Sequence, residues 1–148
     1  MTITERLTER KLSEEMLAEF ERGLGARLPD DYRQFMIEHN GGRPAPSVFE
    51  FMTADGTSDC SVRVFLTLDD RENYSIQTYM SRYDDRIPLQ TLPIACDSFG
   101  NLVLLDLGAK AVGTIYFWDH EKESMDDPTW DNINVAAFSF TEFINTLA

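Results

Sequence analysis

The chain has 148 residues, of which 43% are hydrophobic and 11% aromatic, which argues against disorder and suffices for one packed domain over residues 1–148. It carries 26 Asp and Glu residues against 13 Lys and Arg residues, for a net charge of -13 at pH 7. Such a charge repels phosphate groups and anionic lipids, so it argues against direct binding of nucleic acid or membranes and favours a basic protein partner.

The acidic side chains are concentrated in the later part of the chain. Residues 1–43 hold 7 Lys and Arg against 9 Asp and Glu, whereas residues 44–148 hold 6 against 17. The two cysteines, Cys60 and Cys96, lack the spacing of a metal-binding or redox pair, which predicts reduced thiols. The N-terminus has no apolar signal core, and no run approaches about 20 apolar residues, so we expect a cytoplasmic protein without a membrane span.

The first part of the chain is predicted to be mostly helical. Residues 1–12 are compatible with either a leading helix or a loose N-terminal arm. Ser13, followed by two glutamates, predicts a helix start, and an apolar stripe at helical spacing carries this helix to Gly25. A second helix is predicted from Pro29, which precedes two acidic residues, to Asn40, which precedes two glycines.

The pattern then changes from helix to strand. Residues 43–46 contain two prolines and cannot form a central strand, so they are predicted to join the helical part to the sheet. Strands are predicted at residues 48–52 and 61–66, the second because apolar side chains alternate along it. Residues 53–57 are the predicted hairpin loop between these two strands.

Two further helices are predicted from periodicity and capping signals. Between Asp69 and Tyr83, apolar residues recur at a period of about 3.6, which predicts a third helix over the sheet with Asp69 or Asp70 as its N-cap. Near the C-terminus, Ser139 and Glu142 have the spacing of a capping box. The apolar residues that follow predict a final helix.

Residues 92–121 are predicted to form the centre of the fold. Three short runs of β-branched, aromatic and leucine side chains are separated by turn clusters at residues 97–101 and 107–110. Turns this short join antiparallel neighbours, which predicts a meander. The predicted fold class is therefore α+β, with an antiparallel sheet of about five to six strands flanked by N-terminal, middle and C-terminal helices. A mixed sheet is the open alternative.

An ordered set of short segments runs from about residue 13 to residue 147. The set comprises an amphipathic helix ending near Leu24–Gly25, Leu28–Tyr32 with Phe35, Asn40–Gly42, Leu92–Ala95 with Asp97 and Gly100–Asn101, Gly113–His120, and Ala137–Phe140 with Phe143. In this order the segments resemble the SUKH superfamily, which includes the fungal Smi/Knr cell-wall regulators and many bacterial immunity proteins. This chain departs from the pattern at Phe99, in a turn where relatives often carry small residues.

The resemblance implies an α+β domain in which these motifs mark helix ends and strand turns more than a catalytic centre. For many bacterial members it also implies binding to a toxin delivered between neighbouring cells, often a nuclease, and neutralisation of that toxin. The fungal relatives imply an alternative, a non-enzymatic regulatory or scaffolding module of the Smi/Knr type.

The sequence Asp119-His120-Glu121 is the strongest candidate for chemistry, because an imidazole between carboxylates can bind zinc or transfer protons. On a strand, however, His120 would face away from both carboxylates, and a turn at the end of the strand is the predicted alternative to a chemical role. Asp97 and Asp106 fall at strand ends, where aspartate commonly makes turn hydrogen bonds. The chain shows no nucleophile constellation and no phosphate-binding loop, so we expect no catalytic residue, no metal, no cofactor and no enzymatic activity.

The acidic run from residue 119 to residue 131 is the predicted partner-binding site. Its carboxylates would mimic the phosphates of nucleic acid and give fast, salt-sensitive association with a basic toxin, expected to be a nuclease. Trp130 would supply an aromatic anchor, whereas Trp118 is predicted to be the more buried of the two tryptophans. A solvated loop that only maintains solubility is the alternative. The predicted site residues are Asp119, Glu121, Glu123, Asp126, Asp127, Trp130 and Asp131.

Overall fold

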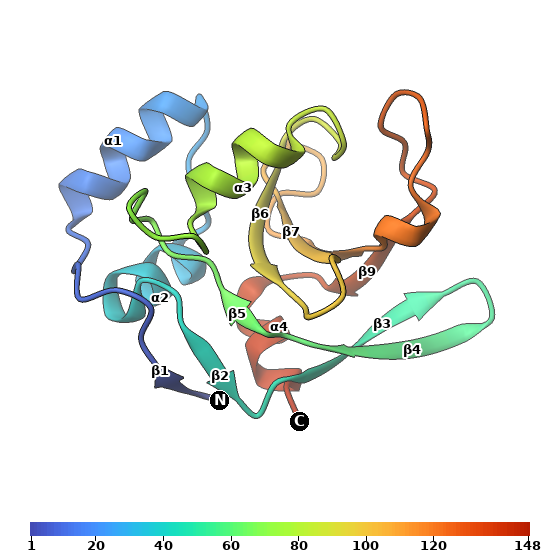
Figure 1. The fold of residues 1–148 in the computed structure, drawn as a ribbon, viewed down its shortest axis with the longest axis horizontal. Helices are drawn as coiled ribbons and strands as arrows, with labels where there is room; N and C mark the ends of the chain where they lie inside the picture. Colours follow the sequence, from blue (N-terminus) through green and yellow to red (C-terminus); the bar gives the residue numbers. More distant parts are fainter.

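The computed structural model describes residues 1–148, and it has the α+β class that the sequence predicts (Figure 1). None of its helices has the length and apolar content needed to cross a lipid bilayer. In chain order the elements are β1 (Thr2–Glu5), α1 (Glu14–Leu24), α2 (Asp30–His39), β2 (Arg43–Ala45), β3 (Val48–Thr53), β4 (Gly56–Ser61), β5 (Val64–Phe65), α3 (Ile76–Tyr83), β6 (Thr91–Cys96), β7 (Leu102–Asp106), β8 (Ile115–Trp118), the 3₁₀ helix η1 (His120–Lys122), β9 (Ile133–Ala137) and α4 (Phe140–Thr146).

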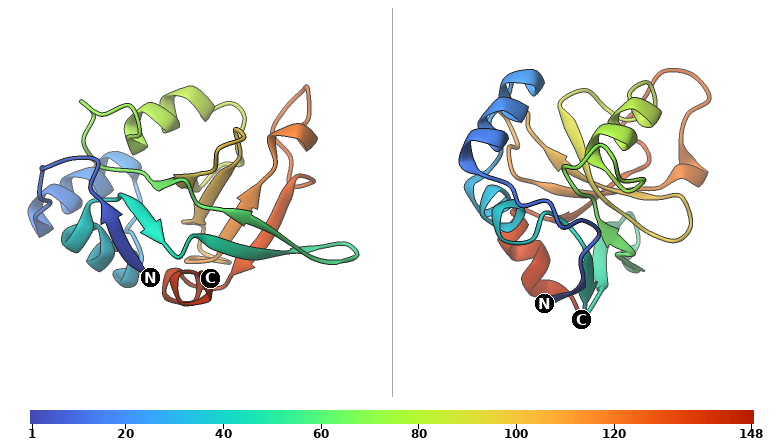
Figure 2. Two further views of the ribbon diagram at one scale, coloured as in Figure 1. Left: turned by 60° about the horizontal axis from the view of Figure 1, so that its bottom comes forward. Right: turned by 60° about the vertical axis from the view of Figure 1, so that its left-hand side comes forward.

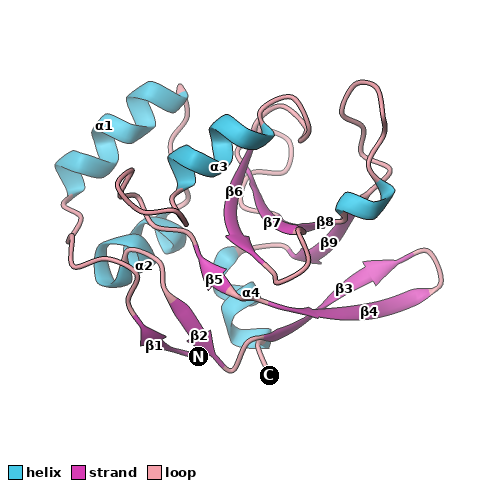
Figure 3. Ribbon diagram, in the orientation of Figure 1, coloured by secondary structure: helices cyan, strands magenta, loops and turns pink.

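The strands form one five-stranded sheet and two two-stranded sheets (Figure 3). The large sheet has the order β5-β6-β7-β8-β9, and β1 pairs with β2 and β3 with β4. Every one of these ladders is antiparallel, which confirms the predicted meander through β6, β7 and β8. In the ladder between β7 and β8, Leu102 lies opposite Trp118 and Leu105 lies opposite Ile115. These two apolar strands are therefore paired with each other along their length.

The large sheet is covered on both faces, as its nearly continuous apolar strands require (Figure 2). On one face, Tyr83 of α3 meets the fully buried Trp118 edge-on, with ring centroids 5.7 Å apart. On the other face, Phe117 stacks on Phe51 of β3 with centroids 4.3 Å apart. Helix α4 closes this second face, because its Phe143 meets Phe49 at 5.1 Å. Adjacent residues of β8 therefore hold opposite layers in place.

The predicted pairing of the first hairpin is wrong. Strand β3 pairs with β4, in register from Val48 opposite Ser61 to Thr53 opposite Gly56, so Ser61 is the only residue of the predicted 61–66 strand that belongs to its partner. Strand β4 has the sequence Gly-Thr-Ser-Asp-Cys-Ser, which has no apolar alternation from which a strand could be predicted. The apolar run after it is buried on both sides and supplies the short strand β5, which pairs with β6.

The predicted start of the third helix is also wrong, because α3 begins at Ile76 and its N-cap is Ser75. The Asp69 carboxylate is buried in the preceding loop. It accepts hydrogen bonds from the Thr8 hydroxyl at 2.6 Å and from the Arg71 guanidinium at 2.8 Å. These partners lie outside the helix, so Asp69 fastens the N-terminal segment to the loop instead of capping α3.

Residues 2–5 form strand β1 against β2, and neither a leading helix nor a loose arm. Gly42 makes this contact possible, since it has a φ of 123° and a Cβ there would lie 2.5 Å from a methyl group of Ile3.

At the other end of the chain, β9 was not predicted. The Ser139 cap is confirmed, because Ser139 Oγ accepts from the Glu142 backbone at 3.0 Å, whereas the Glu142 carboxylate accepts from the Phe138 backbone at 3.0 Å, one residue before the cap.

Candidate functional site

The predicted site begins where β8 ends. After Trp118 the chain turns into η1, and the Asp119 side chain caps this turn by accepting from the Glu121 backbone at 3.0 Å. Residues 119–121 therefore form a turn at the end of the strand, which is the predicted alternative to a chemical role, and they do not continue β8. The Asn132 side chain donates to the Asp119 carbonyl at 2.9 Å, so the acidic segment leaves the sheet and returns to it at almost the same point.

Glu123 anchors the acidic segment to the body of the protein. Its carboxylate pairs with the Arg86 guanidinium at 2.6 Å and 3.2 Å. The same guanidinium lies over the rings of Tyr83 and Trp118, at 4.6 Å and 5.4 Å from their centroids. Because Arg86 already neutralises it, Glu123 is an anchor of the segment and not a free carboxylate for a partner.

Four other acids of the segment form no ion pair. None of the salt bridges in the protein includes any of four exposed carboxylates, those of Glu121, Asp126, Asp127 and Asp131. Trp130 is 51% exposed and rests edge-on against Tyr116, with ring centroids 5.3 Å apart. Trp118 is fully buried, as predicted. The segment thus presents unpaired negative charge beside one half-exposed aromatic ring.

A groove of about 490 Å³ adjoins the acidic segment. Its walls are β4, the turn at residues 97–101 and residues 119–121, and it is lined by four carboxylates and no Lys or Arg: Asp59, Asp97, Asp119 and Glu121. Phe99, at the rim, is 76% exposed. The sequence marked Phe99 as unusual in its turn, but it did not indicate that β4 brings Asp59 to the same groove.

Inside this groove, Asp97 organises the turn between β6 and β7. Its carboxylate accepts from the Phe99 and Asn101 backbones at 2.8 Å each and from the Asn101 side chain at 2.6 Å. The Asn101 amide oxygen in turn accepts from the His120 backbone at 3.0 Å and lies 2.7 Å from His120 Nδ1. The network therefore joins the 97–101 turn to η1, which agrees with the structural role expected for Asp97.

Cys60 touches this network but does not make it a nucleophilic centre. Its thiol donates to the Asp97 carboxylate at 3.2 Å. Burial, and then this hydrogen bond to a negative group, raise the pKa of the Cys60 thiol to about 12, so it stays protonated at neutral pH. Both cysteines are free, as expected.

Asp106, the other strand-end aspartate, accepts from the Tyr116 hydroxyl at 2.6 Å and the Gly108 backbone at 2.7 Å, again as a turn residue.

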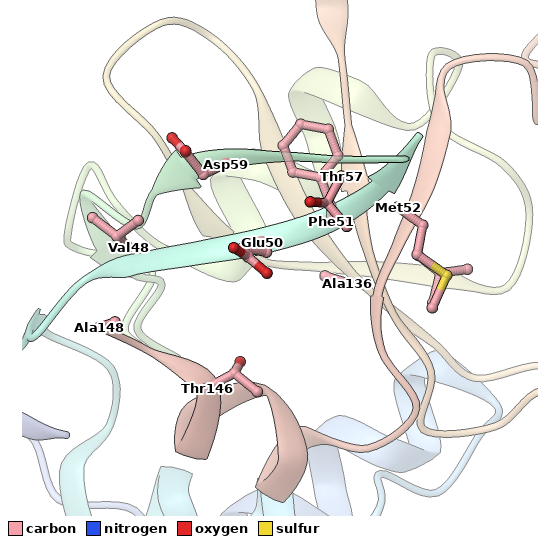
Figure 4. Close-up of a pocket in the computed structure, with 10 residues that line it drawn as sticks. Val48, Glu50, Phe51, Met52, Thr57, Asp59, Ala136, Thr146 and Ala148 are labelled. Carbon is pink, nitrogen blue, oxygen red and sulfur yellow. The ribbon is translucent and has the colours of Figure 1, made fainter. Parts of the chain in front are cut away.

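A second hollow, of about 390 Å³, lies between β3, β4, β9 and the end of α4 (Figure 4). Val48, Met52 and Ala136 supply apolar lining. Glu50 of β3 and Asp59 of β4 also line it, and they are directly opposite each other in the hairpin register. Like charges in this arrangement destabilise a hairpin, and no Lys or Arg pairs with either. The sequence did not reveal this pair because β4 itself was not predicted.

The fold and these surfaces define an α+β protein with an antiparallel meander as its core and a hollowed acidic edge. Residues 14–144 match the family SUKH_6, described as SMI1-KNR4 cell-wall, and the chain belongs to this family. It is also similar to the SPbeta prophage-derived uncharacterized protein YokK of Bacillus subtilis (strain 168). The two are 28% identical over 148 residues, which cover 90% of this chain and 73% of the relative.

Proposed function

We propose that this protein is an immunity protein, which binds a bacterial toxin with a basic surface and neutralises it by occupying that surface. Membership of the SUKH superfamily supports a protein partner of this kind. The observation that carries the proposal is the acidic edge, where unpaired carboxylates of residues 119–131 adjoin a groove that contains no Lys or Arg side chain. The proposed mechanism is stoichiometric binding without chemistry by the immunity protein itself.

The charge of the edge suits a nuclease toxin in particular. A nuclease binds phosphate groups through Lys and Arg side chains, and free carboxylates on a firm scaffold compete for the same cations. The net charge of -13 speeds the encounter at low salt, and the exposed aromatic rings of Trp130 and Phe99 then provide apolar contact area. Electrostatic steering by the net negative charge sets the association rate, and contact with the aromatic rings slows dissociation.

The second candidate is a regulatory or scaffolding module without a toxin partner, which the family's cell-wall description favours. The two functions differ in genetic context and in effect on growth. An immunity protein is expected beside a gene for a toxin and protects a cell that produces that toxin. A scaffolding module has no such neighbour and gives no protection.

The test is to express the product of the adjacent gene in the cytoplasm of a host cell, with and without this protein. We expect the adjacent product to inhibit growth alone, co-expression to restore growth, and the two proteins to purify as a complex of fixed stoichiometry. Absence of both protection and a complex would contradict the immunity function. A complex without any growth phenotype would favour the scaffolding module.

A further inference from the structure

The outer edge of β4 is an unpaired strand edge. Strand β4 hydrogen-bonds to β3 on one side only, and no backbone hydrogen bond joins its six residues to any other part of the protein. The β3–β4 hairpin projects from the body in Figure 1 and in the left-hand view of Figure 2. Proteins commonly protect such edges with proline or lysine, and β4 contains neither.

The register identifies the backbone groups that are free. Val48 exchanges backbone hydrogen bonds with Ala148 on the far side of β3, so the pair of Val48 and Ser61 is not hydrogen-bonded within the hairpin. Because such pairs alternate along an antiparallel ladder, Thr57 and Asp59 also direct their N–H and C=O groups away from β3. These groups form a row on the outer edge of β4, where another strand could pair.

The surroundings of this edge are acidic on both sides. On the outer face of the hairpin, Asp59 lies opposite Glu50 with no cation beside either. On the other side, the groove continues from β4 to the carboxylates of Asp97, Asp119 and Glu121. A strand added here would lie between two sets of carboxylates, and a Lys or Arg opposite Asp59 would relieve the repulsion between Asp59 and Glu50.

We infer that β4 is a docking edge for an extended, basic segment of the protein partner, which adds to the hairpin as an antiparallel third strand. The inference rests on the proposed function, since it specifies how part of a toxin is held. Main-chain hydrogen bonds to Thr57 and Asp59 supply affinity, and the carboxylates select cationic side chains at alternate positions of the added strand. The groove beside residues 119–121 receives the rest of the segment.

Charge argues against a second copy of this chain as the occupant. Pairing β4 with β4 would bring the Asp59 and Glu50 carboxylates of two copies together, and each copy has a net charge of -13. Like charges on adjacent strands oppose pairing, so a homodimer through this edge lacks the complementarity that a basic segment has.

The probe for this edge is a nine-residue peptide of alternating lysine and threonine, titrated to millimolar concentration at low salt. Amide hydrogen exchange is measured residue by residue. We expect exchange of the Thr57 and Asp59 amides to slow about tenfold or more at saturation, because they gain partners. The Ser58 and Cys60 amides already face β3 and are the internal control, with a smaller change.

Two matched peptides separate strand addition from charge attraction. N-methylation of every lysine blocks the peptide edge that faces β4, whereas N-methylation of every threonine leaves that edge intact and the charge unchanged. We expect the first peptide to bind at least about fivefold more weakly than the second, as loss of even one hydrogen bond predicts. The Thr57→Pro substitution in the protein should weaken binding of the threonine-methylated peptide to a similar extent, because it removes the outward N–H of residue 57. Thr57→Ala, which keeps this N–H, is the control.

Equal affinities of the two methylated peptides, or no slowing of exchange at Thr57 and Asp59, would overturn the inference. So would a dimer of the free protein that Thr57→Pro abolishes, because the occupant would then be a second copy. If Thr57→Pro folds and binds the adjacent-gene toxin as tightly as the parent protein, strand addition is wrong while the immunity function stands. If the peptide protects β4 but no toxin is bound or neutralised, the edge is supported and the immunity function fails.

Discussion

The five-stranded sheet and the acidic edge beside it have opposite physical designs. Strands β7 and β8 are buried along their whole length, and their backbone groups pair with neighbours on both sides. The edge, made of residues 119–131, the turn at residues 97–101 and the β3–β4 hairpin, exposes carboxylates without partners and strand groups without a neighbour. We therefore expect the sheet to carry most of the stability and the edge to be the proposed binding surface, so substitutions in the two regions should have separable effects.

The largest expected effect is that of Phe117→Ala in the sheet. Phe117 is buried and stacks on Phe51, so its removal leaves a cavity between β8 and the hairpin. We expect the free energy of unfolding to fall by about 3–5 kcal/mol in urea denaturation. Phe99→Ala is the matched control at the edge, with a change within about 0.5 kcal/mol because Phe99 is exposed. Equal losses in the two variants would remove the distinction between the regions.

The second effect concerns Asp69, which joins the N-terminal segment to the body. Hydrogen bonds from Arg71, and then from Thr8, hold the pKa of Asp69 below its ordinary value near 3.9. The stability that the carboxylate contributes is therefore present above pH 4 and is lost as the pH falls through the lowered pKa. At pH 7, Asp69→Asn should reduce the free energy of unfolding by about 2 kcal/mol, since hydrogen bonds to a charged group are weakened.

The pH dependence provides the check on Asp69. The difference in stability between the parent protein and Asp69→Asn should shrink when urea denaturation is repeated from pH 6 down to pH 3. Asp126→Asn is the control at the edge, because Asp126 is exposed and has no cationic partner. A difference for Asp69→Asn that does not change with pH would show that the carboxylate charge contributes nothing.

The third and smaller effect is that of Arg86→Ala, at the boundary between the two regions. This substitution removes the ion pair to Glu123 and the guanidinium that covers Tyr83 and Trp118. Because Arg86 is partly exposed, we expect a loss of only about 1 kcal/mol, together with faster amide exchange in residues 119–131. Unchanged exchange in that segment would mean that Glu123 does not anchor it.

Much of the fold could be predicted because its signals are local. The Ser13 and Ser139 caps and the meander through β6, β7 and β8 depend on residues a few positions apart, and all are confirmed. Strand β4 was missed because a polar hairpin strand has no apolar period. The start of α3 was misplaced because Asp69 bonds to Thr8, 61 residues away, and no local pattern reports such a partner.

The candidate site could likewise be predicted only where its features are local in the sequence. The acids of residues 119–131 are adjacent in the sequence and were visible as a run. The neutralisation of Glu123 by Arg86, 37 residues away, was not visible, and neither was the meeting of Asp59 with Asp97 and Asp119 around one groove. Long-range strand pairing creates these relationships, and a single sequence contains no direct record of it.

The most direct test of the proposed function is the association rate of the proposed partner, the product of the adjacent gene, with two charge-reversed variants. One replaces Asp126, Asp127 and Asp131 by lysine, and the other replaces Glu9, Glu15 and Glu19, which are exposed on or before α1, on the far side from η1 in Figure 1. Each variant has a net charge of -7 in place of -13, because each reversal adds two positive units.

At low salt, we expect stopped-flow association rates to fall about tenfold or more for the edge variant and no more than about threefold for the α1 variant. The difference should disappear near 1 M salt, where charges are screened within about 3 Å. Equal rates for the two variants at low salt would contradict steering by the acidic edge, because net charge alone would then guide the partner.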